Sequence, residues 1–271
     1  MNLEELKSGG TKVEKFTLIT GGASGLGKDL AKLFAKENNN LLLISSNENN
    51  LSTAKKELSE EFKNIKIETL CLDLANPLNL PKIKEFTDSK EMFINNLVNC
   101  SGYGDRTDFK EMDIKFNMRM TELNCNTPFY LCRTYINDMI KNNEGSIMNI
   151  ASIAAFMPAP FMSTYHATKA YLLLLSEAIS RELKGTNVTC TAICPGPFAS
   201  NFVNVAKNNY EFDKIKVIPS ETVANKAFKA YKKKKVVKII GFKNQLMVFA
   251  LRFVPRKLVR AIAASTMKEN A

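Results

Sequence analysis

Short apolar segments alternate with amphipathic helical segments along most of the chain, and this alternation is the strongest constraint on its fold. Continuous apolar strands between helices are typical of a parallel sheet that is covered on both faces. Sequential βα units predict an α/β fold with a doubly wound, mostly seven-stranded parallel sheet and ligands beyond the carboxyl ends of its strands. The expected strands are 16–20, 41–45, 65–74, 93–99, 145–152, 188–194 and part of 231–241; the expected helices are 25–37, 48–62, a segment ending near 89, 111–141, 164–184 and one beginning at 220.

The length and composition predict one domain in the cytoplasm. A chain of 271 residues can bury a full core, and we expect a single domain over 1–271 with a core of about 14–241 and a tail of about 242–271. The N-terminal segment contains acids and lacks the apolar stretch of a secretory signal, and no stretch approaches the roughly 18 apolar residues of a membrane span. The six cysteines lack metal-binding spacings, so we expect reduced thiols and no metal site.

Positive charge is concentrated near the C-terminus. The segment 222–268 contains thirteen Lys and Arg residues and no acid, and "FKNQLMVFALRFVPRKLVRAIAAS" places cations beside apolar helical faces on both sides of Pro255. Three interpretations stay open: a helical pair that packs on the domain or on a second subunit, a helix on an anionic membrane surface, or a docking site for an acidic partner. Peripheral association at the inner membrane surface is therefore an alternative to a purely cytoplasmic location. No DNA-binding motif is present, and we expect no nucleic-acid partner.

A glycine-rich turn follows the first expected strand. "TGGASGLGKDL" places Gly21, Gly25 and Gly27 between that strand and the first helix. A tight turn and a close approach to a pyrophosphate both need residues without Cβ, and the helix N-terminus faces the phosphates. The turn therefore indicates a dinucleotide site, although a simple tight connection would show a similar pattern.

A tyrosine and a lysine share one face of the helix expected at 164–184. Tyr165 and Lys169 are four residues apart, whereas His166, the single histidine of the chain, points about 100° away around the helix. A nearby ammonium stabilises a phenolate, so we expect Lys169 to lower the pKa of Tyr165 and make it an acid or base at a carbonyl. Ser152, at the end of an expected strand, supplies a donor for the substrate oxygen. We expect His166 to take no part in the chemistry.

From about residue 17 to residue 202, the sequence resembles the short-chain dehydrogenase/reductase superfamily of the classical type, whose fold is of the Rossmann type. The segments that carry the resemblance are "TGGASGLG", "CLDL", "NCSG", "ELNCN", "NIAS", "YHATK" and "CPGP", in family order. The resemblance implies that Tyr165 is the catalytic acid/base, that Ser152 orients the substrate oxygen, that Lys169 holds the cofactor ribose, and that Asn124 positions a water. It implies that Asp73 contacts the adenine.

The predicted cofactor site is larger than the glycine turn. Cys100 and Ser101 depart from the family's NNAG motif, and this departure affects packing beside the cofactor. The complete set of predicted cofactor-binding residues is Gly21, Ser24, Gly25, Leu26, Gly27, Ser46, Asp73, Leu74, Asn99, Ser101, Gly102, Tyr165, Lys169, Pro195, Gly196 and Phe198.

The edge of the second expected strand bears on the choice of cofactor. NAD-selective sites carry an acid there for the ribose hydroxyls. Ser45, Ser46 and Asn47 occupy this edge, and Glu48 is expected in the first turn of the next helix. No acid repels a 2′-phosphate, so the sequence favours NADP slightly over NAD.

Apolar residues flank the expected catalytic tyrosine and follow the "PGP" turn. Phe156, Met157, Phe161 and Met162, and then Phe198, Phe202 and Val203, favour a hydrophobic ketone or aldehyde and its alcohol as the substrate pair, with the loop at 197–218 closing over it. The run from Tyr171 to Leu175 favours a homodimer or homotetramer. The predicted function is NAD(P)-dependent oxidoreduction; the alternative is a catalytically silent dinucleotide-binding regulator or a membrane-surface scaffold.

Overall fold

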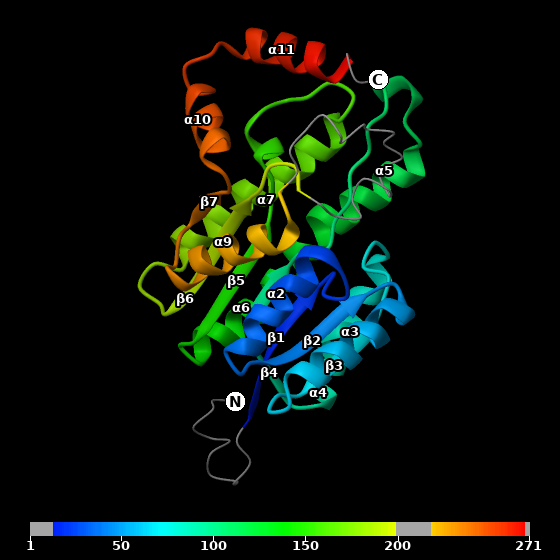
Figure 1. Ribbon diagram of the computed structural model, residues 1–271, viewed down its shortest axis with the longest axis vertical. Coiled ribbons are helices and arrows are strands. Elements are labelled where there is room, and N and C mark those ends of the chain that lie inside the picture. Colours follow the sequence, from blue (N-terminus) through cyan, green and yellow to red (C-terminus); the bar gives the residue numbers. More distant parts are fainter. Residues whose placement is uncertain (1–12, 199–217, 269–271) are drawn as a thin grey trace.

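Seven parallel strands form one sheet in a computed structural model that describes residues 13–198 and 218–268 (Figure 1). The strand order β3-β2-β1-β4-β5-β6-β7 is that of a doubly wound sheet, which confirms the predicted fold class. The strands are β1 (Glu14–Thr20), β2 (Asn40–Ser45), β3 (Ile67–Cys71), β4 (Met92–Asn99), β5 (Gly145–Ile150), β6 (Val188–Cys194) and β7 (Val237–Ile239).

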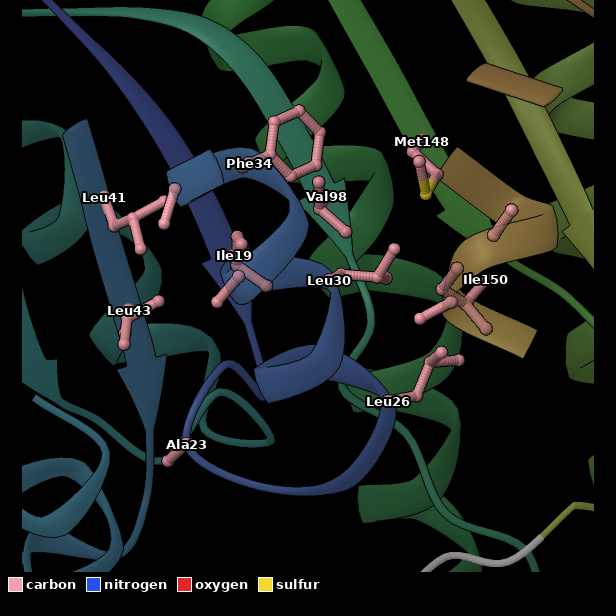
Figure 2. Close-up of a cluster of buried hydrophobic side chains, with 14 of the residues drawn as sticks. Ile19, Ala23, Leu26, Leu30, Phe34, Leu41, Leu43, Val98, Met148 and Ile150 are labelled. Carbon is pink, nitrogen blue, oxygen red and sulfur yellow. The ribbon is translucent and has the colours of Figure 1, made fainter. Parts of the chain in front are cut away.

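Helices cover both faces of the sheet. In the core, residues of α2, α3 and α9 pack together on one face, and residues of α4, α6 and α7 pack on the other. Figure 2 shows part of the first layer, where Leu30 and Phe34 of α2 lie beside Ile19 of β1. The helices are α2 (Gly25–Lys36), α3 (Glu48–Glu61), α4 (Leu80–Ser89), α5 (Ile114–Thr121), α6 (Thr127–Lys141), α7 (Ser163–Glu182), α9 (Ser220–Lys232), α10 (Phe242–Ala250) and α11 (Arg256–Lys268).

The strand order reverses between β1 and β4. From β1 the chain continues outward to β2 and β3, and it then returns to place β4 on the other side of β1. At the carboxyl ends, Thr20 of β1 is paired with Ile44 on one side and with Asn99 on the other. Loops diverge at such a point and leave a crevice, which is where doubly wound sheets bind their ligands.

The helix predicted over 111–141 contains a π-helical turn. The chain forms α5, then a π-helical turn over Glu122–Asn126, and then α6. Pro128 has no N–H to donate to the carbonyl of Asn124, and the Thr127 N–H instead reaches back to the carbonyl of Glu122. The chain is thus helical from Ile114 to Lys141, so the predicted helix is confirmed except that it begins three residues later, and Asn124 lies within the π turn inside it.

Two strands end earlier than predicted. The strand expected over 65–74 ends at Cys71, so Asp73 lies in the loop beyond it. The strand expected over 145–152 ends at Ile150, and Ser152 instead caps a short 3₁₀ turn, Ile153–Phe156, where its hydroxyl accepts from the Ala154 N–H. Both polar side chains thus sit on loops at the carboxyl edge of the sheet, where side chains are free to face a ligand.

Two helices follow the last strand, on either side of Pro255 as predicted. Figure 1 shows α10 and α11 beyond the carboxyl ends of the strands, at the opposite end of the molecule from the start of β1. Of the helices in the described part of the chain, none has the length and apolar character needed to cross a membrane.

Candidate active site

One cavity of about 660 Å³ lies at the carboxyl edge of the sheet, over the crevice between β1 and β4. Its walls come from the loops that follow β1 to β6, so residues far apart in sequence meet there. Sixteen predicted site residues line it: Gly21, Ser24, Gly25, Leu26, Gly27, Ser46, Asp73, Leu74, Ser101, Gly102, Ser152, Tyr165, Lys169, Pro195, Gly196 and Phe198. Asn99 and Asn124 are not among the lining residues.

The glycine turn is packed so tightly that side chains would not fit. A Cβ at Gly27 would lie 2.1 Å from the carbonyl oxygen of Gly21, and Gly21 itself has φ +67° and lies against Ser101. Gly25 has φ +48° with open space beside it. The turn thus brings the start of α2 against β1, and no side chain of Ser24 caps that helix start. The first N–H groups of α2 therefore face the cavity and can bind an anion.

Thr20 fixes the opposite wall of the crevice. Its hydroxyl accepts hydrogen bonds from the backbone N–H groups of Cys100, at 3.0 Å, and Ser101, at 3.1 Å. This contact ties the loop after β4 to the end of β1. Cys100, one of the departures from the family motif, is partly buried, and the loss of water around its thiol raises the pKa of that group to about 12. The thiol is therefore neutral at physiological pH and acts as a small apolar group.

The edge of β2 is polar and uncharged, as predicted. Ser45, Ser46 and Asn47 line the cavity, and the Asn47 side chain caps α3 by accepting from the Asn50 N–H at 2.9 Å. Glu48 lies in the first turn of α3, where a carboxylate suits the helix dipole.

Asp73 already has partners for its carboxylate. One oxygen accepts from the Ala75 N–H at 3.0 Å, and the other pairs with Arg119 of α5 at 2.6 Å. This pair is half-exposed and lies in the cavity wall beside Leu74. A contact with adenine, implied for Asp73, stays a prediction, and it would have to share the carboxylate with Arg119.

Tyr165 and Ser152 meet inside the cavity. Tyr165 is partly buried and lines the cavity, and a hydrogen bond joins its hydroxyl to Ser152. Ser152 is itself held by the Ala154 N–H at 3.1 Å. Two hydroxyl groups are thus fixed side by side, an arrangement that can hold one carbonyl or alcohol oxygen of a ligand.

Burial controls the acidity of this pair. It raises the pKa of Tyr165 to about 12, and the hydrogen bond with Ser152 acts weakly in the opposite direction. The expectation that Lys169 lowers this pKa was wrong: its ammonium lies 5.8 Å from the ring centroid and donates to the Ile150 carbonyl at 2.9 Å. Burial also lowers the pKa of Lys169 to about 8. At neutral pH the site therefore contains a protonated phenol ready to donate.

Asn124 lies behind the cavity wall. Its amide donates to the Tyr103 carbonyl at 2.9 Å and to the Thr168 hydroxyl at 3.1 Å. A Cβ on Gly102 would contact both Asn124 Oδ1, at 2.8 Å, and Lys169 Nζ, at 3.4 Å. Asn124 therefore holds the loop after β4 in place next to Lys169. Its predicted role in positioning a water stays a prediction.

Two other polar residues of the predicted motifs form hydrogen bonds or contacts within the protein instead of facing a substrate. His166 lines the cavity, but its Nδ1 contacts the Met157 carbonyl at 2.8 Å, and burial lowers its pKa. Its ring meets that of Tyr165 edge-on, with 6.0 Å between centroids. Asn99 points into the core and donates to Asn149 at 2.8 Å. Asn99 thus joins β4 to β5 rather than facing the cavity.

Residues 15–211 match the family described as short chain dehydrogenase. The chain belongs to this family. The resemblance implied by the seven sequence segments is confirmed, and with it the assignment to an oxidoreductase family.

Named relatives of this short-chain dehydrogenase include a yeast enzyme. The very-long-chain 3-oxoacyl-CoA reductase of Vanderwaltozyma polyspora is 30% identical over 228 residues, which cover 80% of this chain but only 65% of that protein. This chain thus spans less than two thirds of that relative's length.

Solved structures share the fold. A short-chain dehydrogenase from Sphingobium yanoikuyae in complex with NADPH has a TM-score of 0.80 and 24% identity, covering 90% of this chain and 94% of that one. A relative from Burkholderia phymatum in complex with NAD has a TM-score of 0.79 and 20% identity, covering 91% and 95%. At this identity, the likeness supports the fold alone.

Sequence reasoning missed three polar residues of this short-chain dehydrogenase site. Tyr103, Arg106 and Arg119 line the cavity. Arg119 lies in a segment that has the pattern of an ordinary amphipathic helix, so no local signal separates it from a solvated cation.

Of the apolar wall predicted around Tyr165, Met157 and Met162 line the cavity and Phe156 and Phe161 do not. Phe198 also lines it; Phe202, Val203 and most of the predicted closing loop lie outside the described residues.

Proposed function

We propose that the protein is an NADP-dependent reductase of hydrophobic ketones or aldehydes, in which Tyr165 donates the proton. The observation that carries the proposal is the hydrogen bond between Tyr165 and Ser152 inside the cavity that the glycine turn borders. A phenol with a raised pKa is a donor at neutral pH, which suits the direction toward the alcohol.

The residues of the cavity fit a nicotinamide dinucleotide. Gly25, where a Cβ would meet open space, leaves room for a pyrophosphate at the uncapped start of α2, and Gly21 and Gly27 let the turn pack closely enough to place that helix start. The polar edge at Ser45, Ser46 and Asn47 suits the ribose end, and Pro195 to Phe198 border the other end, next to Ser152. The bound dinucleotide would supply the hydride.

The side chains supply the proton and hold the oxygen. Ser152 donates a hydrogen bond to the substrate carbonyl, and Tyr165 transfers its phenolic proton to that oxygen as the C=O bond becomes a C–O–H group. With the hydride that the dinucleotide would supply to the carbonyl carbon and the proton from Tyr165, the carbonyl would become the alcohol, and the enzyme would be left one proton short. Solvent restores that proton to Tyr165, and the cationic Lys169, which lines the same cavity, is proposed to hold the ribose of the dinucleotide.

The substrate is proposed to be apolar. Met157, Met162 and Phe198 line the cavity close to Tyr165. Sulfur and aromatic groups that adapt to flexible chains suit an acyl or alkyl substituent better than a sugar. The name of the Vanderwaltozyma polyspora relative, which specifies a very-long-chain 3-oxoacyl-CoA, supports the same class of substrate.

Oxidation of NADPH across a panel of carbonyls tests the proposal. Long-chain ketones, aldehydes and β-ketoacyl thioesters are expected to turn over with higher kcat/KM than small polar carbonyls of the same reactivity. Faster turnover of the small polar compounds would contradict the apolar substrate. Tight NADPH binding without reduction of any compound would favour the alternative of a catalytically silent dinucleotide-binding protein.

The polar edge of β2 sets the expected cofactor preference. Replacing Ser46 by Asp places a carboxylate where the 2′-phosphate of NADPH would lie, and we expect the affinity for NADPH to fall about tenfold or more because like charges repel. The affinity for NADH is expected to stay the same or rise. Dissociation constants measured by titration of nucleotide fluorescence check this, with Ser46→Asn as the uncharged control. A wild-type enzyme that binds NADH more tightly than NADPH would contradict the preference.

The pH profile of reduction is expected to follow Lys169. The reaction needs a protonated Tyr165 and a cationic Lys169, and both conditions hold below pH 8. Above pH 8 the ammonium loses its proton, while the phenol stays protonated up to about pH 12. We therefore expect kcat/KM for reduction to fall by about tenfold per pH unit above pH 8. The Lys169→Met variant is expected to show a low rate without this step, and a wild-type profile that is level to pH 10 would disprove the assignment.

We also propose that the protein is a homodimer or homotetramer. Phe129 of α6 and Tyr171 and Leu174 of α7 are large apolar side chains that are exposed in the single chain. Exposed apolar side chains on two helices are typical of a contact between copies. A monomer in sedimentation equilibrium at micromolar concentration would contradict this.

A further inference from the structure

The two C-terminal helices are fixed to the body of the molecule at the active-site end. Val248 of α10 and Val259 of α11 are buried. Asn244 of α10 donates to the Ile240 carbonyl at 2.7 Å, and a Cβ on Gly196, in the turn that lines the cavity, would lie 2.5 Å from its amide nitrogen. Residues of α10 also contact the 3₁₀ turn that follows Ser152. The helices therefore have a defined orientation, with one side packed and the other outward.

The outward side carries a stripe of large apolar side chains. On α10 and just after it, they recur at helical spacing at positions 242, 246, 249 and 253, and on α11 at positions 258 and 262. More than half of each side chain is exposed: Phe242, Leu246, Phe249, Phe253, Leu258 and Ile262. Phe249 and Phe253 lie edge to face with centroids 5.3 Å apart, so the last residues of α10 and the turn after it share one apolar surface. A water-soluble surface rarely exposes such a patch unless it binds something.

Cations surround the apolar stripe. Lys243, Arg252, Arg256, Lys257 and Arg260 are exposed on these two helices and the turn that joins them. From Thr222 to Met267 the sequence has no Asp or Glu to neutralise them. The surface thus combines apolar side chains that enter a lipid layer with cations that attract its headgroups.

We propose that α10 and α11 bind the surface of an anionic membrane. Charge complementarity favours lipid over a second copy of the chain, because a two-fold contact places the same surface on both sides and would oppose cation to cation. None of the described helices is long and apolar enough to cross a bilayer. In the proposed arrangement, α10 and α11 therefore lie along the interface between the lipid headgroups and water. Since α10 contacts the turn after Ser152, the membrane surface would lie beside the active site; that it delivers an apolar substrate there rests on the proposed function.

Co-sedimentation of the full-length protein with vesicles tests the proposal without any assay of activity. We expect recovery with vesicles of equimolar phosphatidylcholine and phosphatidylserine, and little recovery with phosphatidylcholine alone. Because a cation near an anionic surface contributes about 1 kcal/mol and 1.4 kcal/mol is a factor of ten, the triple variant Arg252→Gln, Arg256→Gln and Arg260→Gln is expected to bind about a hundredfold more weakly. The double variant Phe249→Ser and Phe253→Ser is expected to bind at least about tenfold more weakly, since it removes two exposed rings that would enter the lipid layer.

Matched variants elsewhere on the surface separate this site from general effects. Lys36, Lys56 and Lys63 are exposed at the end of α2, in α3 and just after α3, and their triple Gln variant lowers the net charge equally. Leu78→Ser removes an exposed apolar side chain from the turn that precedes α4. Both controls are expected to bind vesicles as the wild type does.

Equal recovery with both kinds of vesicle, or tail variants that bind like the controls, would overturn the proposal. The proposal would also be overturned if the wild type did not bind vesicles and formed a dimer that the double variant Phe249→Ser and Phe253→Ser dissociates. In that case the helices would bind a second copy of the chain. Loss of vesicle binding leaves NADPH oxidation in solution intact, so this result and a failure of the reductase proposal are distinguishable.

Discussion

Replacing Tyr165 by Phe is expected to lower kcat/KM for carbonyl reduction by about a thousandfold, the scale of a lost general acid. The ring stays in place against His166, and the Ala154 N–H continues to hold Ser152. Only the phenolic proton and its hydrogen bond to Ser152 are removed. The measurement is NADPH oxidation under steady-state conditions with the best carbonyl of the panel.

The other properties of the Tyr165→Phe variant are expected to stay close to those of the wild type. One buried hydrogen bond contributes about 1 kcal/mol to stability, and the dissociation constant for NADPH should not change. Tyr171→Phe is the matched control, since it removes a hydroxyl from the same helix on a half-exposed face outside the cavity. A Tyr165→Phe enzyme with wild-type turnover would refute the role of the phenol as the proton donor.

Replacing Gly27 by Ala is expected to damage both the fold and the dinucleotide site. The added Cβ would lie 2.1 Å from the Gly21 carbonyl oxygen and 2.7 Å from the carbonyl carbon, both of which are backbone atoms that cannot rotate away. Relief requires α2 to move off β1, so we expect a loss of at least about 1–3 kcal/mol in the free energy of unfolding. Because the phosphate cradle is made by the same turn, NADPH affinity is expected to fall by more than about tenfold.

Two other glycines separate steric overlap from backbone strain. Gly185 has φ +97° and Gly25 has φ +48°, and a Cβ at either position would meet open space. Gly185→Ala is expected to cost about 1 kcal/mol of stability without changing NADPH affinity, since it lies far along the chain from the turn. Gly25→Ala is expected to cost a similar amount and to weaken NADPH less than Gly27→Ala does. Urea unfolding and nucleotide titration of the three variants measure these effects, and equal NADPH affinities in all three would contradict the assigned packing role of Gly27.

Local sequence patterns predicted the elements because their causes are local. Strands such as 16–20 and 41–45 appear as continuous apolar runs because both of their faces are buried, and the glycine turn is visible because only residues without Cβ fit between β1 and α2. The π turn within the helix predicted over 111–141 also has a cause in the sequence. Pro128 removes one donor, but the effect on Asn124 becomes evident only when the π turn is seen.

The composition of the site depended on which loops meet. Arg119 comes from α5 and pairs with Asp73 beyond β3, a contact between residues 46 positions apart. Asn99 carries the family's motif, yet its amide is used in the core to join β4 and β5. In both residues, the side-chain direction is set by neighbours that are distant in sequence. The spacing of apolar and polar residues along the chain therefore cannot predict that direction.

The sequence alone determined the doubly wound sheet, the glycine turn, and the tyrosine, lysine and serine that the turn faces, because each follows from spacing along one segment. Tertiary structure alone decided how those groups ionise. Enclosure raises the pKa of Tyr165 to about 12 and lowers that of Lys169 to about 8, opposite to the shift that the spacing of the two residues predicts for the tyrosine. The physical reason is that attraction between two nearby groups can be inferred from their positions on a helix, whereas the loss of water around them depends on everything that the rest of the chain packs over them.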